Sequence, residues 1–191
     1  FNTNLVFPKF LVPLNTSRFS RANLPRTILS VGVNLLDRVN YFTMTNTTAG
    51  ITYNWRETPT KTWDISPAFI SILRLPSITD SFQRLLDINQ FLRNSYKPNF
   101  IEGENIYFTF TDQGRPSARY GYSYVRVGLE EAGALMSGIN GIGRTVNNTF
   151  NFQYAQYVKF DFDARHYRML RGSTAALRFY GGIGLPYDKS E

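Results

Sequence analysis

The sequence predicts an all-β protein, an antiparallel up-and-down sheet of about eight long strands with a short helix in one long loop. Apolar and polar residues alternate with a period of two along most of the chain, as in strands whose two faces meet different surroundings. Clusters of Gly, Pro, Asn and Asp separate these runs and indicate reversals. Aromatic residues, which favour strands, make up 16% of the chain. No composition shift divides the chain, so residues 1–191 form one predicted domain.

Runs of alternating residues predict the first three strands. Residues 4–11 form the first, and a polar connector over residues 14–26 leads to a strand that starts near Thr27. A reversal at residues 37–40, where Asp, Arg and Asn cluster, precedes a third strand over residues 48–56.

Two tryptophans flank the next predicted turn, at residues 57–61. In a membrane barrel, Trp55 and Trp63 would lie at one interface as part of an aromatic girdle, which is the interpretation we favour. In a soluble sandwich the same pair could cap the core. The fourth strand, over residues 63–69, is predicted to carry Trp63, Ile65, Pro67 and Phe69 on one face and Asp64, Ser66 and Ala68 on the other.

Residues 77–93 change to a helical spacing of apolar residues, with Ile78, Phe82 and Leu85 among them. Ser77 is a candidate N-cap, with Asp80 three residues later as a shorter relative of the capping box. We expect a short helix in a long loop. It either packs onto the barrel rim, which is the favoured interpretation, or docks a partner.

Strand patterns resume at Phe100 and continue to a turn at residues 112–116. In the following strand the residues from Tyr124 to Glu130 again alternate between apolar and polar. A loop rich in Gly and Asn follows, over residues 133–149.

Residues 150–170 carry the clearest two-faced pattern. Aromatic and aliphatic side chains occupy one face, and four consecutive charges occupy the other. Charges are costly to bury without partners, and Lys or Arg against lipid at midplane costs about 2–4 kcal/mol each. The charged face must therefore meet water or neighbouring charges. A turn at Arg171 and Gly172 leads to a last strand, where Arg178 is expected to form a cross-strand ion pair with Asp161 or Asp163.

These features together predict a segment of a transmembrane β-barrel. The predicted strands of about 9–15 residues exceed the globular average of about 5–6 and suit a bilayer. Short connections near residues 56–61, 112–117 and 171–172 alternate with long ones near 77–97 and 133–149, as in outer-membrane barrels. The connector near 36–44 is short for the long-loop side and departs from this pattern.

Alternation assigns side chains to the two predicted environments. The predicted lumen-facing charged residues are Arg126, Glu130, Lys159, Asp161, Asp163, Arg165 and Arg178. The predicted lipid-facing or interface residues are Trp55, Trp63, Phe108, Phe110, Val125, Val127, Phe160, Phe162, Leu177 and Phe179.

Several chemical functions are not supported by the composition. The chain has no Cys and one His, so thiolate metal sites, Cys nucleophiles and His-based triads have no basis. We expect no catalytic residue, metal or cofactor, and no enzyme activity. The net charge of +7 raises nucleic acid as a partner. The cations form no dense run and alternate with acids, however, so we expect no nucleic acid and favour a polar lumen or anionic lipid headgroups.

Several segments resemble the barrel of the BamA/TamA family of outer-membrane assembly proteins, in its TamA-like branch. The segments that carry the likeness span nearly the whole chain: residues 7–13, 23–27, 100–103, 107–111 and 179–187. The resemblance implies a barrel of about 16 strands, of which this chain would form about strands four to eleven. Periplasmic POTRA domains, a lumenal loop with an Arg-Gly motif and a lateral gate would lie outside these residues, so no family functional residue falls within this chain.

The resemblance implies a bacterial outer-membrane protein that assists insertion or translocation of outer-membrane proteins. Its partners would be the lipid bilayer, the rest of the barrel, the POTRA domains and unfolded clients. The lumenal charges would hold the lumenal loop or, as we favour, pair across strands in water. A diffusion channel or transporter barrel fits the same alternation. A soluble β-sandwich that binds a ligand is the third hypothesis, in which Asp161 and Asp163 with Glu130 or Glu131 would be acid/base carboxylates.

Overall fold

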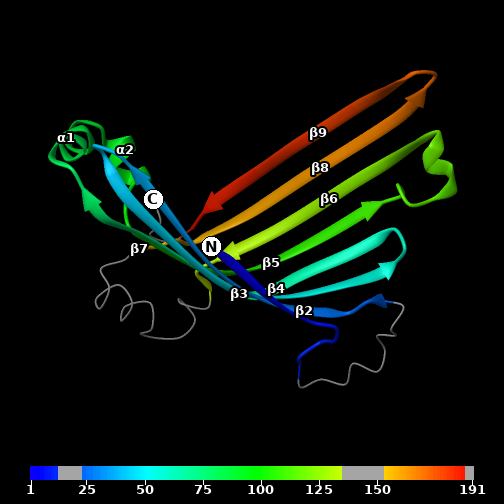
Figure 1. The fold of residues 1–191 in the computed structure, drawn as a ribbon, viewed down its shortest axis with the longest axis horizontal. Coiled ribbons are helices and arrows are strands. Elements are labelled where there is room, and N and C mark those ends of the chain that lie inside the picture. The colour runs from blue at the N-terminus through cyan, green and yellow to red at the C-terminus, as the bar shows by residue number, and fades with distance from the viewer. Residues whose placement is uncertain (13–22, 135–152, 188–191) are drawn as a thin grey trace.

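The computed structural model describes residues 1–12, 23–134 and 153–187, which form one antiparallel up-and-down sheet (Figure 1). Each long strand pairs with its neighbours in sequence. In order across the sheet the strands are β1 (Asn2–Phe7), β2 (Arg26–Arg38), β3 (Phe42–Thr58), β4 (Lys61–Ile78), β5 (Asn99–Thr111), β6 (Gly121–Ala132), β8 (Tyr157–Leu170) and β9 (Ser173–Pro186). The predicted all-β class, antiparallel topology and number of long strands are confirmed.

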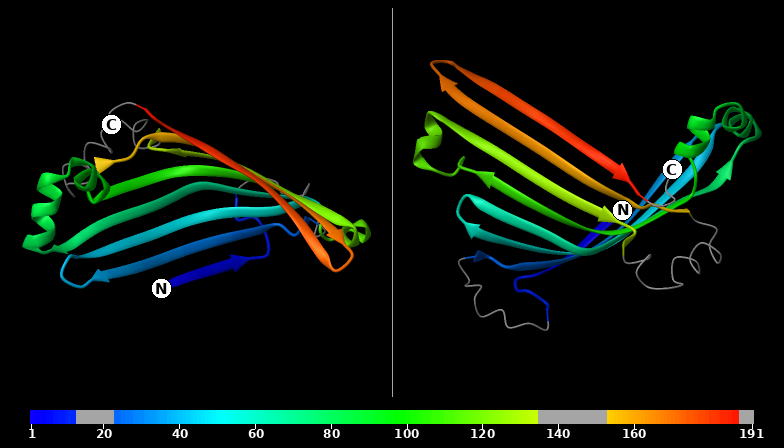
Figure 2. Two further views of the ribbon diagram at one scale, coloured as in Figure 1. Left: turned by 90° about the horizontal axis from the view of Figure 1, so that it is seen from above. Right: turned by 180° about the vertical axis from the view of Figure 1, so that it is seen from behind.

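The sheet is curved but open (Figure 2). β1 and β9 are its two edges and do not pair with each other, so the described residues do not close a barrel. A two-residue strand, β7 (Gln153–Tyr154), lies off this path and pairs in parallel with β5. Seven of the strands have 12 to 18 residues, well above the average of about 5–6 for globular proteins.

The connections divide between two rims of the sheet. At one, which we call the turn rim, lie the β3–β4, β5–β6 and β8–β9 connections, and the helices lie at the other, the loop rim (Figure 1). Adjacent turns are joined, because Thr111 N donates to Thr60 O at 2.8 Å and Met169 N donates to Tyr120 O at 3.0 Å. The β5–β6 connection is longer than the predicted turn, since it includes the 3₁₀ helix η2 (Pro116–Arg119).

A β-bulge at Pro67 inverts the two faces of β4. At this point β4 has one residue more than each of its neighbours. Ile65 pairs with Tyr53 and Ile106, but Ala68, three residues later, pairs with Ile51, only two residues from Tyr53. The prediction that Phe69 shares a face with Trp63 is therefore wrong. A proline has no N–H to donate to the ladder, which is why it is tolerated at a bulge inside a central strand.

The predicted helix is a pair of helices, α1 (Asp80–Ile88) and α2 (Gln90–Ser95). The predicted cap is wrong, because Ser77 lies in β4 and the Thr79 hydroxyl accepts from Phe82 N instead. The Asn89 side chain caps α2 by accepting from Leu92 N at 3.1 Å. Both N-caps satisfy amides that have no partner inside the helix.

The main buried cluster lies where the helix pair meets the loop rim. Phe82 and Leu86 of α1 pack against Phe42 at the start of β3, with Met44, Leu75, Leu92 and Tyr96 partly buried around them. Rim packing, the favoured interpretation of this helix, is thus confirmed. In the described parts of the chain the buried hydrophobic residues are Phe42, Phe82, Leu86, Phe100 and Ala132. The sheet itself therefore has almost no covered core.

Several strand boundaries differ from the predicted ones, and β3 and β4 are both longer than the strands predicted over residues 48–56 and 63–69. The first strand ends at Phe7, before Pro8, and Lys9 O accepts a hydrogen bond from the Thr27 hydroxyl at 2.8 Å instead of pairing in the ladder. The long strand predicted over residues 150–170 begins only at Tyr157. Residues 155–156 separate β7 from β8, and Ala155 N donates a hydrogen bond to Phe100 O. The predicted loop over residues 133–149 lies almost entirely outside the described residues.

Candidate functional site

Strand register places the seven predicted lumen-facing charges on one face of β6, β8 and β9, which we call the polar face. Arg126 lies opposite Asp163, Glu130 lies opposite Lys159, and Arg165 lies opposite Arg178. Asp161 lies between Gly128 and Gly182 on the same face. That these side chains share a face follows from the register. That the face lines a lumen stays a prediction.

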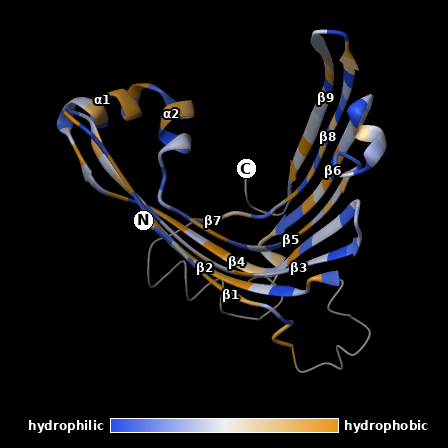
Figure 3. Ribbon diagram, turned by 45° about the vertical axis from the view of Figure 1, so that its right-hand side comes forward, coloured by the Kyte–Doolittle hydropathy of each residue, from blue (hydrophilic) through white to orange (hydrophobic). Residues whose placement is uncertain are grey.

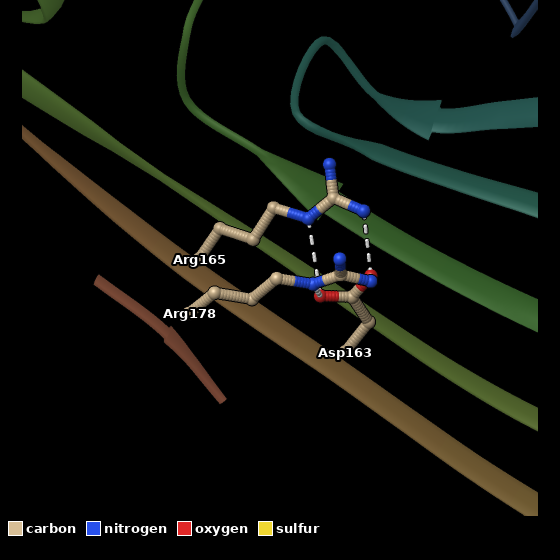
Figure 4. Close-up of polar contacts among 3 residues, drawn as sticks. All are labelled: Asp163, Arg165 and Arg178. Atoms are coloured by element: carbon tan, nitrogen blue, oxygen red, sulfur yellow. Dashed lines mark hydrogen bonds and ion pairs between the residues drawn. The ribbon is translucent and has the colours of Figure 1, made fainter. Parts of the chain in front are cut away.

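Asp163 is the centre of the polar face (Figure 4). Its carboxylate is buried and accepts two hydrogen bonds from each of two guanidinium groups. The shortest donor–acceptor distances are 2.6 Å from Arg165 and 2.8 Å from Arg178. Bidentate arginine–carboxylate pairs are among the strongest charge-assisted hydrogen bonds. β8 and β9 are thereby clamped together by side chains as well as by the ladder.

The predicted cross-strand ion pair of Arg178 is confirmed. Arg178 bonds Asp163, as one of the two expected pairs, whereas Asp161 takes part in none of the ion pairs between described residues. The Asp161 carboxylate instead leans over Gly128, and the Tyr107 ring leans over the same glycine from β5. A Cβ at position 128 would clash with both groups.

A second network surrounds Glu130. Tyr157 OH donates to its carboxylate at 2.5 Å, Tyr107 OH donates at 3.4 Å, and the Lys159 ammonium lies 3.9 Å away. The Arg126 guanidinium lies over the Tyr107 ring, 4.2 Å from its centroid. Tyr107 and Tyr157 were not among the predicted site residues. Their period-two placement in line with the polar residues Asn105 and Lys159 was the available signal.

The opposite face of the sheet is apolar and uncovered. Register joins Trp55, Trp63, Phe108, Val127 and Phe162 in one row across β3, β4, β5, β6 and β8. A second row joins Phe110, Val125 and Phe179, and Phe160 and Leu177 lie on the same face by parity. The ten predicted lipid-facing residues thus share one face, which we call the apolar face. Figure 3 shows hydrophobic and hydrophilic residues alternating along the strands.

Exposure distinguishes this face from a protein core. Phe160 is 43% exposed, Phe179 is 67% exposed and Leu177 is 73% exposed. Large hydrophobic residues of β1, β2 and β5 on the same face, including Leu5, Val31 and Ile106, are exposed as well. A contiguous uncovered apolar surface of this extent marks an interaction site for lipid or protein.

The two tryptophans lie side by side at the turn rim. Their rings are stacked with centroids 6.2 Å apart, and Trp63 also contacts the Phe108 ring. The Trp63 indole N–H donates to Glu57 at 2.9 Å. An apolar ring with a hydrogen-bonded polar edge suits a boundary between apolar and aqueous surroundings. The girdle interpretation nevertheless stays a prediction.

The described residues show no cluster of metal-ligating side chains. No group of three or more His, Cys, Asp or Glu residues within residues 1–12, 23–134 and 153–187 could hold a metal ion. The single histidine, His166, lies near the turn rim with its Nδ1 3.1 Å from the Ser123 hydroxyl. None of the helices in these residues is long and apolar enough to cross a membrane.

Comparison with protein-family models, with curated proteins and with solved structures gives no match for this chain.

Proposed function

We propose that this chain forms part of the wall of a bacterial outer-membrane β-barrel that assists insertion or translocation of outer-membrane proteins. The observation that carries the proposal is the contrast between the two sheet faces. The apolar face is uncovered across the sheet, whereas the polar face holds the ion pairs of Asp163 and Glu130. Hydrocarbon would cover the first face, and water or other lumenal groups would solvate the second.

Three further features support a membrane wall over a soluble sandwich. The long strands suit a bilayer, which needs about 9–11 tilted residues per strand. Only five hydrophobic residues of the described chain are buried, two of them in α1 rather than in the sheet, which is too few for a soluble domain of this size. Two of the connections at the turn rim, β3–β4 and β8–β9, are two-residue turns, whereas the helix pair occupies the β4–β5 connection at the loop rim. A sandwich would require a second layer over the apolar face.

The assembly role rests on the resemblance to the BamA/TamA family, and a diffusion channel is the other candidate. The polar face favours neither, because paired charges suit a structural wall and a channel lining alike. In the assembly role this segment is the rigid back of the barrel, with Asp163 and its arginines locking two strands.

Single cysteines test the membrane wall directly, because the chain has no cysteine of its own. Within each of two matched pairs of variants, the two cysteines are adjacent in sequence and lie on opposite faces. The pairs are Val127→Cys with Arg126→Cys, and Phe160→Cys with Asp161→Cys. In protein refolded into vesicles, we expect a charged maleimide to label the polar-face cysteines and to spare those on the apolar face. Equal labelling within each pair would contradict the proposal, as would a folded, monomeric protein without detergent.

Two assays separate assembly from conduction. Vesicles that contain the refolded chain should speed the folding of an unfolded outer-membrane client, relative to empty vesicles and to vesicles with an unrelated barrel. If the chain instead gives stable conductance in planar bilayers without affecting client folding, the channel function replaces the assembly function.

A further inference from the structure

The positive charge of the protein is concentrated at the turn rim. Six cations lie in or beside the β3–β4, β5–β6 and β8–β9 connections, against two carboxylates, Glu57 and Asp112, which is an excess of four positive charges. All but Lys61 are exposed. The six are Arg56, Lys61, Arg115, Arg119, Arg168 and Arg171.

The rim cations are not used in ion pairs between described residues. The four such pairs involve Arg93, Lys159, Arg165 and Arg178. The two rim carboxylates already accept hydrogen bonds, Glu57 from the Trp63 indole and Asp112 from Ser123 N at 2.6 Å. The rim therefore presents an excess of positive charge to whatever lies beyond it.

The loop rim shows no such excess. The helix pair carries Asp80 and Asp87 against Arg84 and Arg93. At the same rim β5 begins and β6 ends in acidic residues, which are Glu102, Glu104, Glu130 and Glu131. The charge asymmetry thus lies along the strand direction, which in the proposed barrel is the direction across the membrane.

Aromatic rings connect the rim cations to the apolar face. Trp55 and Trp63 lie on that face beside the β3–β4 turn. The Arg119 guanidinium lies over the exposed Tyr120 ring, 4.6 Å from its centroid, in the β5–β6 connection. An apolar face, then aromatic rings, then cations is the sequence of surroundings met on leaving a bilayer through an anionic headgroup layer.

We infer that the turn rim binds the headgroups of anionic phospholipids in the leaflet that it faces. The inference rests on the proposed membrane wall and adds a lipid class to it. The cations are spread along the turn rim from β3 to β9, at the ends of the strands that carry the apolar face. Each cation near an anionic surface strengthens association by about fivefold at low ionic strength.

The two tryptophans provide the test, because they are the only ones in the chain and both lie at this rim. Energy transfer from tryptophan to headgroup-labelled dansyl lipid is measured in vesicles that contain the refolded protein. Labelled phosphatidylglycerol is compared with labelled phosphatidylcholine in a phosphatidylcholine background. We expect several-fold stronger transfer to phosphatidylglycerol, which falls as salt is raised.

Two charge-matched triple variants locate the effect. Arg115→Gln, Arg119→Gln and Arg171→Gln together should remove most of the preference for phosphatidylglycerol. The control, Arg38→Gln, Arg84→Gln and Lys97→Gln, removes equal charge from the loop rim and should leave the preference unchanged. Each set contains one arginine stacked on a tyrosine, Arg119 on Tyr120 and Arg38 on Tyr41, so loss of that contact is matched.

The outcomes separate the inference from the function on which it rests. No transfer to either lipid would overturn the membrane wall itself. Equal transfer to both lipids in the original protein, or equal loss in the two triple variants, would overturn the lipid preference alone. Tight binding of polyphosphate or duplex DNA by detergent-solubilised protein, lost in the turn-rim variant, would assign the rim to a soluble polyanion instead.

Discussion

At the scale of single residues, Asp163 is the most heavily engaged side chain on the polar face. It is buried, while its partners Arg165 and Arg178 are 36% and 55% exposed. The arginines therefore keep much of their hydration, whereas the buried carboxylate depends on the two arginines for its hydrogen bonds. Asp161, two residues earlier on the same strand and face, has no such pairs among the described residues. The two aspartates thus provide a matched comparison.

We predict that Asp163→Asn destabilises the folded protein by about 1–3 kcal/mol, because it removes one charge from a doubly bidentate cluster. Asp161→Asn should change stability by less than about 0.5 kcal/mol. The measurement is the urea dependence of unfolding in detergent micelles, followed by far-UV circular dichroism. Similar losses in the two variants would mean that the arginine clamp adds no stability of its own.

At the scale of elements, Pro67 determines which side chains of β4 meet which face. Without this residue the ladder with β3 would be regular from Thr45 to Arg56, since Tyr53 pairs with Ile65 and Ile51 pairs with Ala68 on either side of it. The Thr52 and Ser66 hydroxyls already lie 2.9 Å apart between those two pairs. Pro67 is therefore a single-residue insertion into the central stretch of this ladder, which has two further irregularities near its ends.

Deletion of Pro67 should consequently be tolerated, with a stability change below about 1 kcal/mol, because all flanking pairs keep their partners. Deletion of Ile72, in a regular part of β4, should be severely destabilising, because it moves every following side chain to the other face or requires a new bulge. Refolding yield and urea midpoints in micelles measure both effects. A severe loss on removing Pro67 would show that the bulge itself is required.

At the scale of the whole molecule, the sheet has two unlike faces and almost no interior. Its packed cluster lies at one rim, under α1 and α2, while the apolar face remains uncovered. Such a sheet is stable only where something apolar covers that face. In the proposed membrane wall the covering material is hydrocarbon, so the energetic effect of a charge depends on the face on which it is placed.

We predict that Phe162→Lys, near the middle of β8 on the apolar face, destabilises the protein in vesicles by about 2–4 kcal/mol. Asn105→Lys serves as the control, because Asn105 lies on the polar face opposite Glu130 and should accept a cation at little cost. Urea unfolding in vesicles measures the difference. Equal effects of the two substitutions would contradict a lipid-covered face.

Much of the fold could be predicted from local pattern. Strict alternation over residues 157–170 fixed which side chains of β8 share a face, and the turns at Pro59–Thr60 and at Gly172 followed from their composition. Gly172 has a φ of +77°, a conformation that glycine adopts without strain. Failures came where an interaction across strands determined the structure, as at Pro67, or where Thr79 rather than Ser77 reached the first free amide of α1.

The sequence by itself determined the two-faced strands, because a period of two places alternate side chains on opposite sides of any strand, whatever its neighbours. Only the tertiary structure decided the register between neighbouring strands. Register brought Asp163 to Arg178 and left Asp161 over Gly128, a choice between two carboxylates on one face that spacing along a single strand does not contain. Tertiary structure also decided that the described sheet stays open, because closure depends on partners for the edges of β1 and β9, which no local pattern specifies.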